Sequence, residues 1–176
     1  MLNGEEGIEY LPYFPLEQNQ SLQLEHDRAV IGIEHNQHPV FEFNPKNDQA
    51  VSERTLLLQT KSGSLRSIKH IKANNWRDFT CGNEKTITKM LELIDAAQEG
   101  KTTPILIHCK GGVGRTGQMV AIHHLRERAL HGEPFDVIDT VRQMRDPSTG
   151  RTKEMVQRDE QLQFTHRYLL NLAPNN

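Results

Sequence analysis

The residues with the clearest chemical potential are Cys109 and Arg115, which are separated by five positions, three of them glycine. Glycines at this density allow a loop to curl so that successive backbone N–H groups point into one space. A helix that opens near Thr116 would add the positive end of its dipole to that space. Amide donors and a guanidinium around one thiol predict a cradle for a phosphoryl dianion that needs no metal.

The same cradle changes the chemistry of the thiol. Inward-pointing amides and a helix dipole favour a thiolate, so the pKa of Cys109 is expected to lie below its ordinary value of about 8.5. Arg115 can bind two phosphate oxygens as a fork, and His108 and the Thr116 hydroxyl are placed to stabilise charge on the sulfur. These residues predict nucleophilic attack by sulfur on phosphorus.

Alternation of apolar and turn-forming segments indicates the elements that must position this loop. Apolar residues 104–107 predict a buried strand that ends at Cys109. The other predicted strands are 26–33, 39–43, 55–60 and 65–72, with a hairpin turn at 61–63. The predicted helices are one that starts at 84 and ends at Gly100, followed by 116–131, 135–145 and 157–172. This order predicts an α/β fold, a twisted mixed central sheet flanked by helices.

Four segments resemble the cysteine-dependent protein tyrosine phosphatases, in particular their tyrosine-specific branch. In chain order the segments are 13–15, 67–79, 108–116 and 155–161. They resemble, respectively, the family's Tyr-Trp-Pro segment, its strand and mobile Trp-Pro-Asp loop, its His-Cys-x5-Arg-Thr phosphate loop, and its glutamine loop. The segments occur in the family's order, so the resemblance extends over nearly the whole chain. It implies the phosphatase fold without the family's N-terminal part.

The resemblance also implies a role for each matched residue. Cys109 would attack phosphorus and form a cysteinyl-phosphate, while Asp78 protonates the departing phenolate. Asp78 would then act as a base on a water positioned by Gln157, and Thr116 would assist the leaving thiolate. The implied catalytic residues are Cys109, Arg115, Asp78, Thr116, His108 and Gln157. The implied phosphate-binding residues are Lys110, Gly111, Gly112, Val113, Gly114, Arg115 and Gln161.

The implied function is a metal-independent protein tyrosine phosphatase that needs no cofactor and acts on phosphotyrosine in proteins. Lys110 leaves a second substrate class open, because it follows the nucleophile where tyrosine-specific members usually have serine. In this respect the chain resembles phosphoinositide-dephosphorylating and some dual-specificity members. An alternative from another class is a phosphate-binding module that lacks turnover.

The chain also departs from the family pattern in its loops. Arg77 stands where the family has proline, and this is expected to change the population of the closed acid loop. An insertion at 146–150 leaves open whether Arg145 or Arg151 occupies the family's second basic position. No segment resembles the family's Lys-Asn-Arg-Tyr substrate loop. The chain is therefore expected to be an N-terminally short variant whose selectivity either comes from other residues or is relaxed.

Composition places bounds on the class of protein. A chain of 176 residues is expected to form a single catalytic domain, 1–176. A net charge of −2 gives no global basic field for nucleic acid. Two cysteines indicate a reducing compartment, and no apolar stretch is long enough for a membrane span. The expected location is cytoplasmic, or the host cytosol if the protein is a secreted effector; the oligomeric state is left open.

Two shorter patterns compete with this interpretation. Residues 112–117 match a Gly-x-Gly-x-x-Gly dinucleotide fingerprint, but helices are predicted beyond them in place of a second strand with an acidic ribose ligand. Cys81 lies three residues after Asp78 and is either an idle loop thiol or a partner for a protective disulfide with Cys109.

Overall fold

The computed structural model describes residues 21–23, 30–34, 39–41, 51–59, 64–74 and 76–174, with side chains at 51–58, 64–74 and 76–174. The chain divides into two compact units. One comprises Met1–Phe41 and Val51–Lys72, and the other comprises Glu42–Ala50 and Ala73–Asn176. The predicted motif at 13–15 and the predicted hairpin turn at 61–63 lie outside the described residues.

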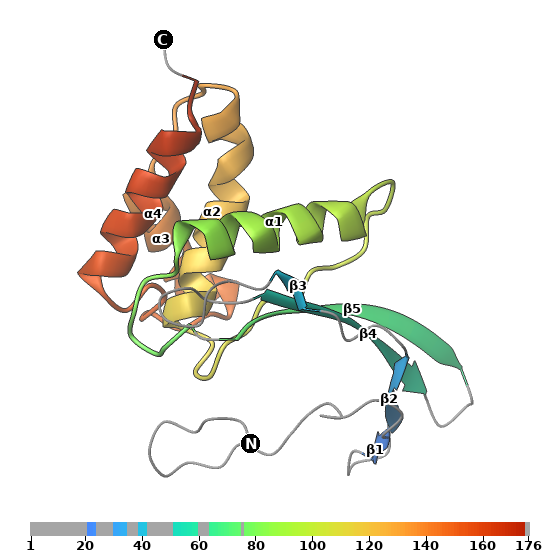
Figure 1. Cartoon of the computed structure of the whole chain (residues 1–176). Coiled ribbons are helices and arrows are strands. Elements are labelled where there is room, and N and C mark those ends of the chain that lie inside the picture. The colour runs from blue at the N-terminus through green and yellow to red at the C-terminus, as the bar shows by residue number, and fades with distance from the viewer. Residues whose placement is uncertain are drawn as a thin grey trace. The chain divides into compact units, whose positions relative to one another are not determined.

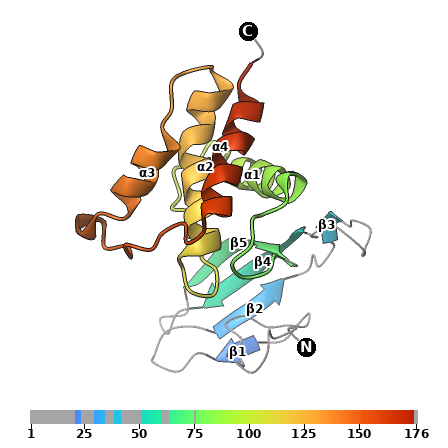
Figure 2. The ribbon, with the colours of Figure 1, turned by 90° about the vertical axis from the view of Figure 1, so that its left-hand side faces the viewer.

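The first unit holds the strands. They are β1 Ser21–Gln23, β2 Val30–Glu34, β3 Pro39–Phe41, β4 Val51–Gln59 and β5 Leu65–Ala73. β4 pairs antiparallel with β2 and with β3, β1 pairs antiparallel with β2, and β5 also pairs with β4 (Figure 2). An ion pair of 3.2 Å between Lys69 Nζ and Glu53 Oε1 links β5 to β4. Strands β2 to β5 overlap the four that the sequence predicts, whereas the three-residue β1 was not predicted.

The second unit holds the helices. They are α1 Glu84–Gln98, α2 Gly114–Leu130, α3 Val137–Met144 and α4 Asp159–Leu172. A short 3-10 turn, η1 Pro147–Thr149, lies within the predicted insertion. α2 contacts both α3 and α4, and Figures 1 and 2 show α2 and α4 side by side. The four predicted helices are confirmed, with ends that differ by a few residues.

The core of the helical unit forms on the buried faces of these helices. One cluster joins the C-terminal half of α2 to α3 and α4, and consists of Leu125, Ala129, Val137, Val141, Val156 and Leu169. A second cluster joins Ala121 of α2 to Met144 and Met155. Since Met155 and Val156 belong to the predicted glutamine loop, this packing anchors the loop beneath α2. Burial of such side chains is the main driving force that fixes the loop there.

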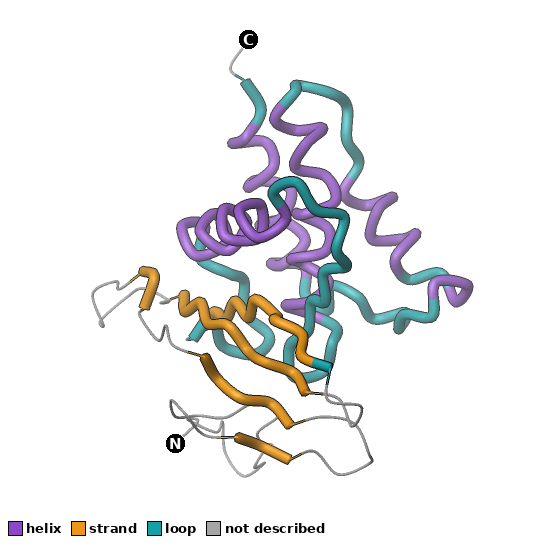
Figure 3. The backbone as a smooth tube through the Cα atoms, turned by 90° about the vertical axis from the view of Figure 1, so that its right-hand side faces the viewer, coloured by secondary structure: helices purple, strands orange, loops and turns teal. Residues whose placement is uncertain are grey.

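The predicted buried strand at 104–107 is wrong. The connection from α1 to α2 has no regular secondary structure between 101 and 109, and Figure 3 shows it as a loop. Leu106 is 87% exposed and Ile105 39% exposed. A strand forms only where a neighbouring strand pairs with its N–H and C=O groups. In the described sheet, β1 to β5 pair only among themselves, so this apolar run has no strand partner there.

Candidate active site

The predicted phosphate loop, within residues 108–116, runs from Cys109 directly into α2. Residues 110–113 form consecutive bends, and the helix begins at Gly114, two residues before the predicted start. Gly112 has φ +68°, a left-handed conformation that glycine adopts without steric cost. A side chain at this turn would be strained, so the glycine permits the loop to curl toward the cysteine.

The Cys109 thiol is surrounded by donors from this loop. Burial raises the pKa of Cys109. Hydrogen bonds from the hydroxyl and amide of Thr116 and from the amides of Val113 and Gly112 lower it by more, so the pKa of Cys109 lies below its ordinary value. Thr116 Oγ1 is buried and makes no conventional hydrogen bond within the described part of the chain, so its proton is available to a sulfur anion. The arrangement therefore favours a nucleophilic thiolate.

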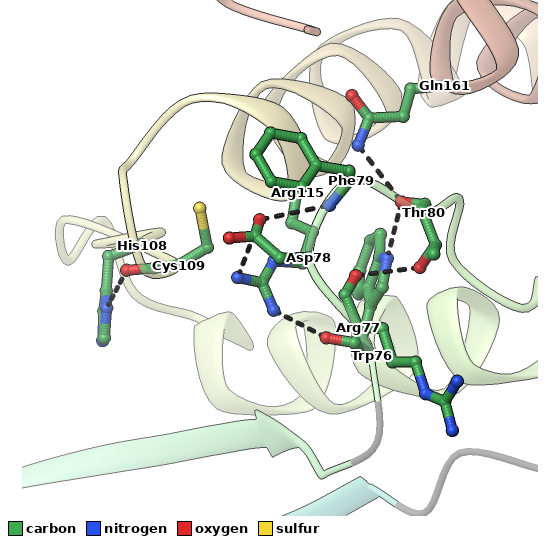
Figure 4. Close-up of polar contacts among 9 residues, drawn as sticks. All are labelled: Trp76, Arg77, Asp78, Phe79, Thr80, His108, Cys109, Arg115 and Gln161. Carbon is green, nitrogen blue, oxygen red and sulfur yellow. Dashed lines mark hydrogen bonds and ion pairs between the residues drawn. The ribbon is translucent and has the colours of Figure 1, made fainter. Parts of the chain in front are cut away.

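Arg115 joins the phosphate loop to the predicted acid loop. One terminal nitrogen donates to the Trp76 carbonyl at 2.6 Å, and the other lies 3.1 Å from Oδ1 of Asp78 (Figure 4). Both charged side chains are 18% exposed, which limits the access of water to the pair. A partly buried pair is weakened less by solvent and salt than a surface pair.

The acid loop, defined here as residues 76–80, is held in a compact turn. The Trp76 indole is buried and its Nε1 donates to the Thr80 carbonyl at 3.2 Å, while the Thr80 hydroxyl donates to the Arg77 carbonyl at 2.8 Å. A β-carbon at Gly82 would lie 2.9 Å from the Trp76 ring, so glycine is needed for the indole to pack there. Figure 4 shows the exposed Arg77 side chain directed away from Arg115.

The two glutamines of the glutamine loop lie in different environments. Gln157 is exposed, and a β-carbon placed at Gly114 would come within 2.8 Å of its Oε1, so this amide lies against the first residue of α2. Gln161 is fully buried, and its Nε2 donates to the Thr80 carbonyl at 3.1 Å. The structure thus places Gln161, which the sequence assigns to phosphate binding, in contact with the acid loop.

The two arginines that flank the insertion differ in their contacts. Arg145 donates from Nε to the Met155 carbonyl and from a terminal nitrogen to the Val156 carbonyl, both at 2.8 Å. Arg151 is exposed. The fork of Arg145 holds Val156 at φ +60°, a strained conformation for a β-branched residue. It therefore fixes the backbone immediately before Gln157.

Two further predicted residues lie at the surface. His108 and Lys110 are exposed, and the His108 ring approaches its neighbour's carbonyl, at 3.4 Å, rather than the Cys109 sulfur (Figure 4). Cys81 and Cys109 are both free thiols, so the disulfide considered from the sequence is not formed. Burial and the charge of Glu160 raise the pKa of Cys81. The two thiols therefore differ in reactivity.

Sequence reasoning missed one residue near the site. The guanidinium of Arg158 lies over the ring of Phe79, 5.0 Å from its centroid. Arg158 directly follows Gln157 in the chain, but its partner lies in the acid loop, far away in sequence. No local pattern indicates such a contact.

Comparison with known proteins identifies the family. The family model described as protein-tyrosine phosphatase matches residues 1–171. The chain belongs to the protein-tyrosine phosphatase family. It is 25% identical over 169 residues to mouse tyrosine-protein phosphatase non-receptor type 20, covering 96% of this chain and 36% of that protein. It is also 31% identical over 93 residues to human phosphatidylinositol phosphatase PTPRQ, covering 53% of this chain and 4% of that protein.

Solved structures confirm the predicted fold of this phosphatase-family chain. Human protein tyrosine phosphatase non-receptor type 18, in complex with HER2 phosphopeptides, aligns with a TM-score of 0.71 and 21% identity. The alignment covers 92% of this chain and 56% of that one. The chain thus spans about a third of the length of the mouse relative and about half of this solved chain. Among the helices that the structure describes, none is long and apolar enough to cross a bilayer.

Proposed function

We propose that this chain is a metal-independent protein tyrosine phosphatase that hydrolyses phosphotyrosine through a cysteinyl-phosphate intermediate. The observation that carries the proposal is the pairing of a Cys109 thiol of lowered pKa with Arg115, which lies in the first turn of α2 and contacts the acid loop at Trp76 and Asp78. A nucleophile, a cation for phosphate and a carboxylate are three groups that phosphoryl transfer to sulfur requires.

In the proposed first step, the Cys109 thiolate attacks phosphorus and the bond from phosphorus to the phenolic oxygen breaks. The electron pair of that bond goes to the departing oxygen, which takes a proton from Asp78. Protonation helps because a tyrosine leaving group has a pKa of about 10. Loop amides of Gly112 and Val113, together with Arg115, hold the charge of the transferring phosphoryl group.

In the proposed second step, a water attacks the phosphorus of the cysteinyl-phosphate. Asp78, now a carboxylate, accepts a proton from this water, and the bond from phosphorus to sulfur breaks to release inorganic phosphate and the thiolate. The position of Gln157 against Gly114 supports its role in orienting the water. The Thr116 hydroxyl donates to the sulfur as it leaves, which regenerates the nucleophile.

Hydrolysis of p-nitrophenyl phosphate in the presence of a metal chelator tests this proposal. The wild-type chain should turn over without added metal, and Cys109→Ser should be inactive, because a hydroxyl is not ionised at neutral pH. Cys81→Ser is the matched control, since it removes the other of the two cysteines and should retain activity. Persistent turnover by Cys109→Ser would exclude the cysteinyl-phosphate route.

A phosphoinositide phosphatase is the second candidate, favoured by the exposed Lys110 next to the nucleophile. A cation at this place favours a substrate that carries several phosphates. The similarity to a phosphatidylinositol phosphatase is in keeping with this candidate. Phosphate release from phosphotyrosyl, phosphothreonyl and phosphoinositide substrates ranks the alternatives. If Lys110→Ser selectively lowers kcat/KM for the phosphoinositide, the second candidate is supported.

A phosphate-binding module without turnover is the remaining alternative, and tight phosphopeptide binding with no product release would establish it. The proposed catalytic unit is residues 1–176, acting as a single domain. Its proposed location is the cytoplasm, or the host cytosol if the protein is a secreted effector, because a thiolate nucleophile has to be kept reduced.

A further inference from the structure

We propose that Arg158 is a positioning residue that holds the acid loop in place and so keeps Asp78 at the Arg115 guanidinium. The inference rests on the proposed function, because it assigns to Arg158 a share in the protonation step of that reaction. Arg158 directly precedes the first residue of α4, and this helix packs into the core. The contact of Arg158 with the acid loop therefore starts from a fixed part of the structure.

The first observation is the contact of Arg158 with Phe79. Phe79 directly follows Asp78, its ring is 54% exposed, and its backbone φ is +58°. An aromatic residue in the left-handed region is strained and persists only where its surroundings hold it. The Arg158 guanidinium lies 5.0 Å from the centre of this exposed ring, within the range of a cation–π interaction. Arg158 therefore offsets part of the strain at Phe79.

The second observation is that the next residue of the loop is held by the same turn of α4. Gln161 Nε2 donates to the Thr80 carbonyl at 3.1 Å, while the backbone N–H of Arg158 donates to Gln161 Oε1 at 3.3 Å. The glutamine is fully buried and is thus a rigid link. Phe79 and Thr80 are accordingly both attached to α4, immediately after the proposed acid Asp78.

The need for such a contact follows from the loop sequence. Arg77 occupies the position before Asp78 where the family has proline, so the loop lacks the restriction on φ that a proline ring provides. A loop with more backbone freedom loses more entropy when it closes. A contact from outside the loop can compensate, and Arg158 makes one beside the acid itself.

Kinetics with two leaving groups test the inference. In Arg158→Ala, kcat/KM for phenyl phosphate should fall roughly 2- to 5-fold, the loss expected for an exposed cation–π contact. The value for 2,4-dinitrophenyl phosphate should stay nearly unchanged, since that leaving group departs without a proton. Arg158→Lys should recover part of the loss. Equal losses with both substrates, or no loss with either, would overturn the inference.

The chain offers a matched control on the same helix. Arg167 lies over the Phe164 ring at 5.6 Å, so Arg167→Ala removes the same charge and the same kind of contact from a ring that does not belong to the acid loop. It should leave the ratio of the two rates as in the wild type. If Arg167→Ala changes that ratio as much as Arg158→Ala does, the effect is one of general charge and the proposed role is wrong.

Tryptophan fluorescence separates this inference from the proposed function. Trp76 is the single tryptophan of the chain and lies in the acid loop, so its emission reports the loop directly. Arg158→Ala should shift the emission and Arg167→Ala should not. This readout needs no turnover. If the wild-type chain is inactive, the proposed reaction is rejected, and the emission of the two variants still tests the contact. An unchanged emission in Arg158→Ala would overturn the inference.

Discussion

Asp78 and Arg115 form an ion pair, with Oδ1 of the carboxylate 3.1 Å from a terminal nitrogen of the guanidinium. The residue proposed to protonate the leaving group is thus bound to the residue proposed to bind phosphate. The same guanidinium donates to the Trp76 carbonyl, so Arg115 contacts both ends of the Trp76–Asp78 segment. A phosphoryl group that binds Arg115 has to share this cation with Asp78, and the ion pair links substrate binding to the position of the acid.

Replacement of the carboxylate tests this competition. In Asp78→Asn, inorganic phosphate or vanadate should bind more tightly, because the side chain no longer neutralises Arg115. The rate with phenyl phosphate should fall about 10²- to 10⁴-fold, the range for loss of a general acid. Inhibition constants and Trp76 fluorescence titration measure the affinity. Asp139→Asn, in the exposed first turn of α3, should change neither quantity. Weaker oxyanion binding in Asp78→Asn would contradict the competition.

The lowered pKa of Cys109 has a direct consequence for alkylation. Only the thiolate reacts, so the rate rises with pH through the pKa, and a lowered pKa moves the inflection to lower pH than for a simple thiol. Thr116→Val removes the hydroxyl that lowers this pKa and should move the inflection upward. Iodoacetamide kinetics in a Cys81→Ser background measure it.

The second thiol serves as the comparison. In Cys109→Ser, the remaining Cys81 should show its inflection above that of a simple thiol, because burial and Glu160 raise its pKa. Coincident inflections for the two cysteines would show that the phosphate loop does not act on Cys109.

The fork of Arg145 is expected to matter for the second chemical step. Arg145→Met removes two donors from the Met155 and Val156 carbonyls, and the free energy of unfolding should fall by about 1.5–3 kcal/mol, the value of a hydrogen bond to a charged group. Gln157 follows directly, so hydrolysis of the intermediate should slow and a burst of p-nitrophenol should appear. Arg151→Met, exposed and nearby, should show neither effect. An Arg145→Met enzyme with wild-type stability and no burst would refute this role.

Gly117 is expected to be intolerant of any side chain. A β-carbon there would lie 2.6 Å from the Val156 backbone nitrogen, which cannot move without disturbing the glutamine loop. Gly117→Ala should therefore lower the free energy of unfolding by about 1–3 kcal/mol. Gly111→Ala is the control for stability, since the nearest atom to its β-carbon would lie 3.9 Å away, in ordinary contact. Urea denaturation of both variants measures the difference, and similar stabilities would contradict the close approach.

The sequence was sufficient for features that depend on neighbouring residues. Helix α1, for example, follows from its amphipathic spacing and from its cap Asn83, whose side chain accepts from the Lys85 and Thr86 amides. The donors around Cys109 were foreseeable for the same reason, because Gly112, Val113 and Thr116 lie within seven residues of it. Short loops have few conformations, so local sequence restricts them strongly.

Only the tertiary structure decided the contacts between segments distant in sequence. The sequence alone does not show which of Arg145 and Arg151 contacts the glutamine loop. Packing of the helices brings Arg145 to the Met155 and Val156 carbonyls. In the same way, the packing of α4 places Arg158 over Phe79. The strand predicted at 104–107 failed because strand formation requires a partner, which a local apolar pattern does not contain. Residue type and local spacing determined which chemical groups this protein has, whereas burial of the shared core determined which of them meet.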